Sequence, residues 1–334
     1  MSDLISYMTK LIKAGVFFIL AWQVCLVRAE VLIVLNSRDA NVSIIDGKTF
    51  ESRALVPSGK EPHHLYPTPD GKNVLIANAG GNDILVMDPM TGAARGRIPN
   101  ILDPYHLALS PDNRWMLITG NRLNHVDLYT YEQPLGDSLP KLKLVKRWPV
   151  SKIPSHVVWS SDSKYAFVTL QESDEIAAFD VDNQTMLWKM RTGRQPAGIA
   201  ITPDDKLLMV GIMGEDYVDV IDWRTQRSVN KIKTGKGAHA FRALGDKRHQ
   251  LVSNRVANTV SIVDMTDMSI VNTFAVPNGP DCMDVSADMK TLYLTARWAR
   301  QLVIIDLQER KITKQIPVGA SPHGVYLHRR AGIL

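Results

Sequence analysis

The sequence contains few cysteines and no motif that identifies an enzyme class. Its 334 residues include only two cysteines, Cys25 and Cys282. It has no G-x-S-x-G, no phosphate-binding loop, no H-E-x-x-H and no C-x-x-C-H. These absences exclude the common signatures of serine hydrolases, nucleotide-binding proteins, zinc proteases and c-type cytochromes. Whether the protein is an enzyme stays open.

Low-complexity and helical segments are lacking as well. Hydrophobic residues make up 45% of the chain and charged residues 22%, which is ordinary for a globular protein. Composition therefore gives no reason to expect extensive disorder. Outside residues 1–29, no segment has the period of a helix, so the chain is expected to fold from strands and turns.

The N-terminus carries the longest apolar run. Two lysines precede the uncharged segment 14–27, and Val27-Arg28-Ala29 resembles a signal-peptidase site. The run is short for a membrane span, which needs about 20 residues. We expect residues 1–29 to be a signal peptide and the protein to be periplasmic, with secretion or an uncleaved membrane anchor as alternatives. Only the uncleaved form would contact a membrane.

Removal of that segment would change the charge and the cysteine count. Losing one acid and three bases takes the formal net charge from +5 to +3. This mildly basic balance gives no argument for a nucleic-acid partner. Cys282 would be the only cysteine of the mature chain, so no intramolecular disulfide is expected.

The rest of the chain is a repeat of 42 residues. Each copy has an opening proline or alanine, a β run, a P-D-G-like turn, a second β run, a polar loop and a further apolar run. The opening residues, at steps of 42, 50, 42, 42, 42 and 42, are Pro62, Pro104, Pro154, Pro196, Ala238, Pro280 and Pro322. A 40–45-residue repeat with four short strands is typical of a β-propeller blade. In the copy opening at Pro196, strands are expected near 198–202, 207–212, 217–222 and 227–233.

An aspartate ends the later apolar run in nearly every copy. These residues are Asp88, Asp180, Asp222, Asp264 and Asp306. Because they recur from copy to copy, a structural role in turns is expected for them.

The two ends of the chain together complete one more blade. Residues 30–57 lack the opening strand, and residues 319–328 contain that strand and little else. We therefore predict an all-β, seven-bladed propeller over residues 30–334, with four-stranded blades. It is closed by N-terminal strands pairing with the C-terminal strand, which removes exposed edges. The eight extra residues fall near 129–147 and predict a longer hairpin, which is either a tolerated insertion or a surface for a protein partner.

The copies resemble the YVTN-type β-propeller repeat of exported bacterial and archaeal proteins over residues 30–328. Segments 193–223 and 321–330 also resemble parts of the d1-haem propellers of nitrite reductases and their haem-maturation relatives. That second resemblance implies a haem d1-like tetrapyrrole with an axial histidine. Since C-x-x-C-H is absent, it implies an accessory, carrier or maturation role in haem or redox metabolism, and it does not single out one histidine as the ligand.

Histidines gather at one register position of the repeat. The two positions after each opening residue hold His63-His64, Tyr105-His106, Ser155-His156, Ala197-Gly198, His239-Ala240, Asp281-Cys282 and His323-Gly324. Six of the nine histidines fall at these positions, where random placement would put fewer than one. In a propeller these positions converge on one mouth of the central channel. Neighbours on a regular strand point to opposite faces, so only one of His63 and His64 is expected to face the channel.

The predicted site combines these histidines with amides and cations from a second loop. We predict that the ligand-binding residues are His63, His64, His106, His156, His239, His323, Arg122, Arg255, Arg297, Asn78 and Asn254. Imidazole suits transition metals, so His64, His106 and His156 are candidate metal ligands. Cys282 is a weaker candidate, because a small buried apolar role is the stronger expectation for it. Arginine suits carboxylates and phosphates.

Three functions fit these residues. The preferred one is a periplasmic propeller that binds a cofactor, a transition metal or a small anionic ligand at the His-rich channel mouth. The second is a hydrolase or lyase, such as a lactonase, that uses the histidines as acid and base on a small anionic substrate. The third is a protein-interaction scaffold in which the histidines only bond the backbone. The fold does not choose among them.

Overall fold

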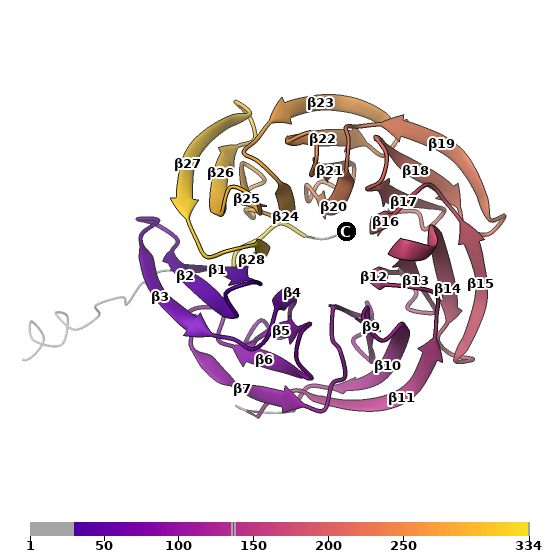
Figure 1. Ribbon diagram of the computed structural model, residues 1–334, viewed down its shortest axis with the longest axis horizontal. Coiled ribbons are helices and arrows are strands. Elements are labelled where there is room, and N and C mark those ends of the chain that lie inside the picture. Colours follow the sequence, from indigo (N-terminus) through magenta and orange to yellow (C-terminus); the bar gives the residue numbers. More distant parts are fainter. Residues whose placement is uncertain (1–29, 135, 137, 333–334) are drawn as a thin grey trace, which may run out of the picture.

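Seven four-stranded antiparallel sheets form a ring around a central channel in the computed structural model of the chain (Figure 1). The structure describes residues 30–332 except 135 and 137, so the predicted signal peptide lies outside it. Within the described part the one helical turn is a 3-10 turn, Gln171–Ser173, and no helix there is long and apolar enough to cross a membrane. The predicted seven-bladed propeller is confirmed.

The blades follow the predicted repeat. Blades 1 to 3 contain β4 (Pro62–Pro67), β5 (Val74–Asn78), β6 (Asp83–Met87) and β7 (Ala94–Pro99); β8 (His106–Leu109), β9 (Trp115–Gly120), β10 (His125–Glu132) and β11 (Lys141–Pro149); and β12 (Pro154–Trp159), β13 (Tyr165–Leu170), β14 (Glu175–Asp180) and β15 (Thr185–Arg191). Blades 4 to 6 contain β16 (Pro196–Ile201), β17 (Leu207–Ile212), β18 (Tyr217–Asp222) and β19 (Arg227–Lys233); β20 (Ala238–Ala243), β21 (His249–Asn254), β22 (Thr259–Asp264) and β23 (Ser269–Ala275); and β24 (Pro280–Val285), β25 (Thr291–Ala296), β26 (Gln301–Asp306) and β27 (Lys311–Pro317).

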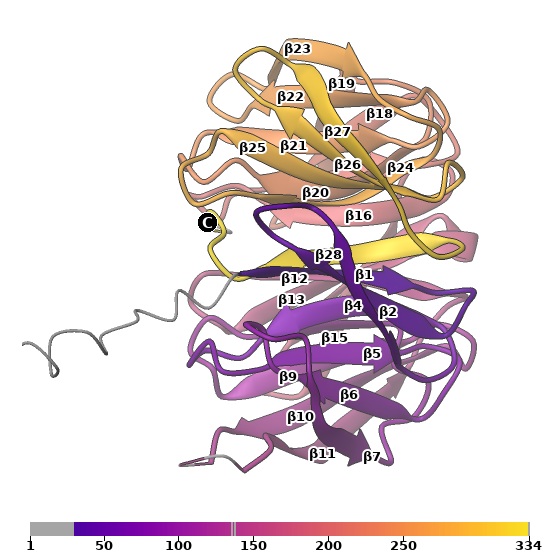
Figure 2. The same ribbon diagram turned by 90° about the vertical axis from the view of Figure 1, so that its left-hand side faces the viewer.

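The seventh blade joins the two ends of the described chain. It contains β28 (Pro322–Leu327), β1 (Val31–Asn36), β2 (Asn41–Asp46) and β3 (Ser52–Pro57). β28 pairs antiparallel with β1, with Val34 opposite Val325, and the two strands lie side by side in Figure 2. The predicted closure is therefore confirmed, and it hides the strand edges that an open ring would expose.

Burial differs between the second strand of a blade and its outermost strand. β1 and β5 are buried along their whole length, whereas β3 is exposed or half-buried throughout. The buried strands are nearly continuous Val, Ile and Leu runs, because each lies between the faces of two neighbouring blades. Leu32 and Val34 of blade 7 pack in one cluster with Leu302 of blade 6. The core thus consists of layers between blades, which fix the inner strands around the channel.

The recurring aspartates hold turns within single blades. Asp88 Oδ1 accepts the backbone N–H groups of Met90 and Thr91 at 2.8 and 3.0 Å. In the turn between β4 and β5, Thr68 donates to Asp70 over 2.6 Å, and Gly71 has a φ of +66°. These bonds satisfy turn groups locally, as expected for residues that recur in most blades.

The eight-residue excess lies in the β10–β11 hairpin of blade 2. These are the longest strands among the described residues, with eight and nine residues. Leu139 at the hairpin lies against Gly96 of β7, where a Cβ atom would come within 2.7 Å of its side chain. The hairpin therefore packs back on blade 1. Binding of a protein partner through 129–147 stays a prediction.

Candidate functional site

A β-bulge opens most inner strands at the position where the histidines occur. In blade 1, Pro62 lies opposite Asn78 and Leu65 opposite Ile76, so two inner-strand residues face one residue of β5. The same shift occurs in β12, β16, β20, β24 and β28. A bulge turns two successive side chains toward one side. The expectation that only one of His63 and His64 faces the channel is therefore wrong.

The bulges bring six histidines from five blades into one cluster. The His63 and His64 Nδ1 atoms lie 2.9 Å apart, and the His63 ring is 3.6 Å from that of His323. The His64 ring lies 4.4 Å from His106 and 4.9 Å from His156, and His156 lies 5.5 Å from His239. Blade 4 contributes no side chain, because a Cβ atom on Gly198 would collide with the backbone oxygen of His239.

The cluster is buried instead of forming an open mouth. His63, His64, His156, His239 and His323 are at most 8% exposed. The sequence placed the histidines at the start of the inner strands, but it could not show that their rings fill the channel there. Five of the six histidines are therefore buried in the channel, and His106 is partly exposed.

Backbone carbonyls fix the protonation of two rings. His64 Nδ1 lies 3.0 Å from the Tyr105 oxygen, and His323 Nδ1 lies 2.7 Å from the His63 oxygen. Because a carbonyl only accepts, both Nδ1 atoms carry the proton and both Nε2 atoms present a lone pair. Neither Nε2 atom has a hydrogen-bond partner, and neither has His156 Nε2 or His106 Nδ1. The cluster therefore contains four buried, unpartnered ring nitrogens.

Burial keeps these imidazoles neutral. It lowers the pKa of His156 to about 4 and that of His323 to about 3. It also lowers the pKa values of His63, His64 and His239 well below 6.5, and the charge of Arg255 adds to this at His239. Burial of a ring disfavours its charged form. The histidines are thus available as neutral ligands near pH 7.

Asp281 is the acidic member of the cluster. It is fully buried, and Arg255 donates to its Oδ1 over 2.6 Å while Arg297 donates to its Oδ2 over 3.3 Å. Burial raises the pKa of Asp281, but the charges of Arg255 and its other neighbours outweigh this and hold the pKa well below 3.8. Sequence reasoning did not select Asp281, although it occupies the same register position as the histidines. That position was the signal for it.

Two groups in the cluster have ligand atoms close enough to hold one metal ion. They are His63, His64 and His323, and His239, Asp281 and His323, with atoms within 4.8 Å of one another in each group. His64 was predicted as a metal ligand, and it belongs to the first group. A metal role for His106 and His156, which line the same space, stays a prediction.

Cys282 contacts the cluster as a thiol. Its Sγ lies 3.4 Å from His323 Nδ1, and burial raises its pKa well above 9.0. A protonated thiol is a poor metal ligand.

The other predicted residues divide between the cluster and local structure. Arg255 contacts His239 and Asp281, and Arg297 contacts Asp281. Arg122 instead bonds the buried Asp103 over 2.9 Å and the Ala79 oxygen. Asn254 bonds side chains within its own blade, and Asn78 bonds Asp83 of its own blade and Ser58 in the connection from blade 7. Ligand binding by these three residues stays a prediction.

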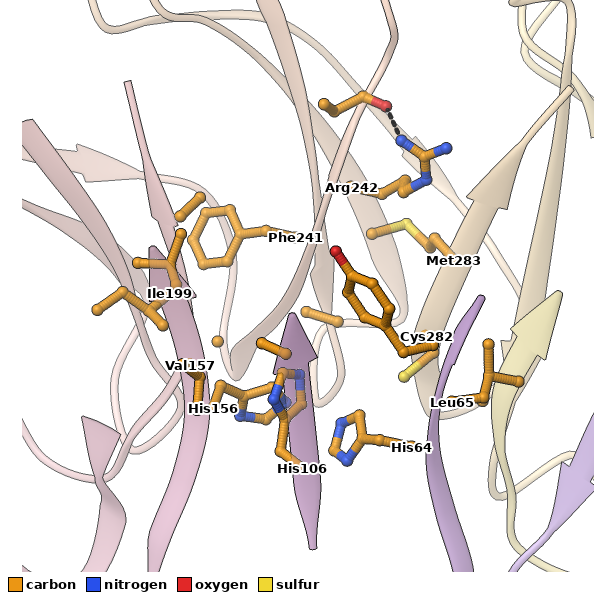
Figure 3. Close-up of a pocket in the computed structure, with 18 of the residues that line it drawn as sticks. His64, Leu65, His106, His156, Val157, Ile199, Phe241, Arg242, Cys282 and Met283 are labelled. Atoms are coloured by element: carbon orange, nitrogen blue, oxygen red, sulfur yellow. Dashed lines mark hydrogen bonds between the residues drawn. The ribbon is translucent and has the colours of Figure 1, made fainter. Parts of the chain in front are cut away.

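A cavity of about 260 Å³ lies directly beyond the histidine cluster. His64, His106 and His156 form one end of it in Figure 3, with Leu65, Ile199 and Phe241 around the space that follows. Ligand pockets for drug-sized molecules measure about 300–1,000 Å³. A cavity of this size does not enclose a tetrapyrrole, and among the six histidines only His106 is partly exposed.

The chain belongs to the YNCE-like beta-propeller family, whose sequence model matches residues 15–332. No curated protein matches it. A functionally unknown protein from Desulfotomaculum acetoxidans has a TM-score of 0.75 at 13% identity, over 90% of this chain and 99% of that one.

Two further similar structures are enzymes. The dihydro-heme d1 dehydrogenase NirN, solved in complex with DHE, has a TM-score of 0.64 at 16% identity, over 90% of this chain and 75% of that one. Hydrazine synthase from Kuenenia stuttgartiensis has a TM-score of 0.64 at 17% identity, over 82% and 96%. The predicted likeness to d1-haem propellers is confirmed, and at these identities it shows the fold.

Proposed function

We propose that the protein is a periplasmic propeller that binds a transition-metal ion through His63, His64 and His323. The observation that carries this is the pair of buried, neutral imidazoles of His64 and His323, whose Nε2 atoms have no partner and which have ligand atoms within 4.8 Å of one another and of His63. Imidazole-rich sites suit zinc, copper, iron or nickel. The periplasmic location is part of the proposal and is supported by the signal-peptide pattern of residues 1–29.

The hydrogen bonds around two of the rings support a metal role. Histidines that bind metals almost always donate their other ring N–H to a carbonyl, a carboxylate or water, which orients the ring. His64 and His323 do this toward the carbonyls of Tyr105 and His63. If these histidines served only to bond the backbone, their Nε2 atoms would remain buried without partners, which is costly.

The surroundings of His323 Nε2 favour a cation at that nitrogen, whichever group of ligands holds it. His323 Nε2 lies 3.5 Å from Asp281 Oδ1. Since the Nδ1 atom of His323 carries its proton, a lone pair faces a carboxylate oxygen there. A cation next to both atoms would turn this repulsion into attraction.

Arg255 favours the first group of ligands over the second. Its guanidinium lies 2.7 Å from His239 Nε2 and donates to Asp281 over 2.6 Å. A positive charge thus already lies between His239 and Asp281. The group His63, His64 and His323 has no such charge within it.

The alternatives have weaker support. General acid–base catalysis works best with a pKa near the working pH, whereas His156 and His323 have pKa values of about 4 and 3. An accessory role in haem or redox metabolism is supported by the structural likeness to NirN, but the cavity does not fit a tetrapyrrole. A metal-binding role in such metabolism fits both observations.

The test is direct metal binding. Purified protein is stripped with a chelator and titrated with Zn²⁺ by calorimetry and with Co²⁺ by absorption spectroscopy. We expect one ion per chain. His64→Leu and His323→Leu are expected to bind at least about 100-fold more weakly, because even groups that only orient a ligand contribute about 10–100-fold.

His249→Leu is the matched control. This histidine pairs with Asp246 at the opposite end of blade 5 and should not affect binding. Circular dichroism and thermal melts establish that each variant is folded. If folded wild-type protein binds neither ion, or if His64→Leu binds as tightly as wild type, the proposal is wrong.

A further inference from the structure

The cavity beyond the histidines combines apolar walls with a positively charged end. Figure 3 shows, around the space, the wall residues Leu65, Ile199, Phe241 and Met283. Arg242 lies at the end away from His64, His106 and His156 in the same view, and Arg330 also lines the cavity. Its lining among the described residues includes no Asp or Glu. The cavity is therefore an apolar chamber with imidazoles at one end and guanidinium groups at the other.

The two arginines share one acidic partner. Arg242 donates to Asp284 Oδ1 over 2.9 Å, and Arg330 Nη1 lies 3.5 Å from Asp284 Oδ2. Within the part of the chain that the structure describes, neither arginine pairs with a second acid. Burial and the charge of Arg330 lower the pKa of Arg242, although the charge of Asp284 opposes this. One positive charge is thus left without a counter-charge at this end of the chamber.

Arg330 is the arginine that a ligand can reach. Arg242 is 6% exposed, and it donates to Asp284 and to three backbone carbonyls. The Arg330 side chain is 17% exposed, and its 3.5 Å contact with Asp284 is longer than the usual hydrogen bond of about 2.7–3.2 Å. A guanidinium group presents its N–H groups as a planar fork that matches a carboxylate. Arg330 therefore offers a carboxylate site at the end of an apolar space.

The rest of the chamber limits the ligand to one negative charge. The imidazoles at the other end are neutral, because burial lowers the pKa values of His64 and His156. A second carboxylate placed near them would lose its hydration without gaining a counter-charge, and a cation would be repelled by the arginines. An apolar body, in contrast, gains by leaving water for walls of Leu, Ile, Phe and Met side chains.

We propose that this chamber binds an organic monocarboxylate with an apolar body, whose carboxylate is held by Arg330 and whose body lies along the inner strands toward the histidines. A medium-chain fatty acid is a simple member of this class. The proposal does not rest on the metal site, because it needs the imidazoles only to be neutral. It therefore applies to the metal-free protein.

Three probes with the same chain length separate the contributions of charge and apolar body. Metal-free protein is titrated by calorimetry with octanoate, with octan-1-ol, which has no charge, and with suberate, which has a carboxylate at both ends. Octanoate is expected to bind at one site per chain and to raise the melting temperature. Octan-1-ol is expected to bind about 10- to 100-fold more weakly, because it loses the charged hydrogen bonds, and suberate is expected not to bind.

Arg330→Gln tests the carboxylate site. Octanoate should bind to this variant about 10- to 100-fold more weakly than to wild type, and no more tightly than octan-1-ol. Arg330→Lys keeps the charge without the planar fork and should bind octanoate with intermediate affinity. Arg329→Gln is the matched control, because it changes the net charge equally at an exposed neighbour that does not line the chamber. It should bind octanoate as wild type does.

Ile199→Trp tests where the apolar body lies. The larger side chain fills the chamber and is expected to abolish octanoate binding, whereas Ile312→Trp adds the same bulk on an exposed outer strand and should have no effect. Circular dichroism establishes that each variant is folded. If Ile199→Trp does not fold, Arg330→Gln still decides, because it changes a side chain that is partly exposed.

The outcomes separate this proposal from the metal proposal. Octan-1-ol or suberate binding to wild type as tightly as octanoate, or octanoate binding to folded Arg330→Gln as tightly as to wild type, would each overturn it. Arg330→Gln leaves His63, His64 and His323 in place, so the same sample should still bind Zn²⁺. Loss of octanoate binding alone thus concerns the chamber, and loss of Zn²⁺ binding alone concerns the histidines.

Discussion

The inner strands carry a buried polar cluster at each end, and the two clusters differ in how their hydrogen bonds are satisfied. At one end Arg242 is 6% exposed and donates to Asp284 and to three backbone carbonyls, two of them in the C-terminal segment. At the other end, His64, His106, His156 and His323 each retain a buried nitrogen without a partner.

We interpret this difference as one between a structural cluster around Arg242 and a candidate ligand site at the histidines. A satisfied buried network stabilises one packing, here the contact between blade 5, blade 6 and the end of the chain. An unsatisfied one lowers stability and persists where a ligand completes it. Four experiments test this contrast in the metal-free protein, from the largest expected effect to the smallest.

Arg242→Met should destabilise the fold by about 3–5 kcal/mol, because Asp284 stays buried after losing its main partner. Urea denaturation measures the change. The double variant Arg242→Met, Asp284→Leu is the control, and it should recover part of the loss because no buried charge is left unpaired. If Arg242→Met lowers the free energy of unfolding by less than about 1 kcal/mol, the Arg242–Asp284 cluster does not stabilise the fold as proposed.

The histidine cluster should make stability depend on pH. The folded pKa of His156 is about 4 against an ordinary value of 6.5, so the unfolded chain binds more protons between these values. Stability is therefore complete above pH 6.5 and falls as the pH drops toward 4. At 1.36 kcal/mol per unit, His156 alone contributes about 3 kcal/mol to this fall.

His156→Leu removes that contribution and should flatten the dependence of the urea midpoint on pH between 6.5 and 4. An unchanged slope in this variant would show that the ring is not buried in its neutral form. His249→Leu serves as the comparison outside the cluster.

A variant truncated after Arg330 should have a free energy of unfolding about 1–3 kcal/mol lower than that of the full chain. Arg242 then lacks the Ala331 and Gly332 carbonyls but keeps Asp284, and the buried Ala331 with its bond to the Val285 carbonyl is lost as well. Thermal unfolding compares this chain with the full one. A loss as large as that of Arg242→Met would mean that the carbonyls, and not Asp284, hold the arginine.

His64→Leu should change the stability of the metal-free protein by less than about 1 kcal/mol in either direction. The substitution removes the hydrogen bond from the His64 ring to the Tyr105 carbonyl, but it also removes the buried His64 Nε2 atom that has no partner. The same variant is expected to lose metal binding. A large loss of stability would show that His64 stabilises the fold, as Arg242 does, and the two clusters would then not differ in this respect.

The positions of the blades and of most cluster histidines could be predicted from the repeat. The register placed His106, His156 and His239 at equivalent positions, and closure by residues 31–57 and 322–327 followed from an incomplete copy at each end. The bulge was not readable, because Pro62 and the residues after it look like the start of an ordinary strand. The side-chain partners of Asn78 and Asn254 were not predictable either, because a polar residue at a strand end bonds nearby side chains as readily as a ligand.

The sequence by itself determined the seven blades, their closure and the gathering of histidines at one level of the channel, since periodicity and β-propensity are local properties that repeat along the chain. Only the tertiary structure decided that these histidines are buried, neutral and incompletely bonded. It also decided that an apolar chamber lies beyond them and that the chain end satisfies Arg242. Each of these depends on how inner strands from different blades approach one another, and residues far apart in the chain make those contacts.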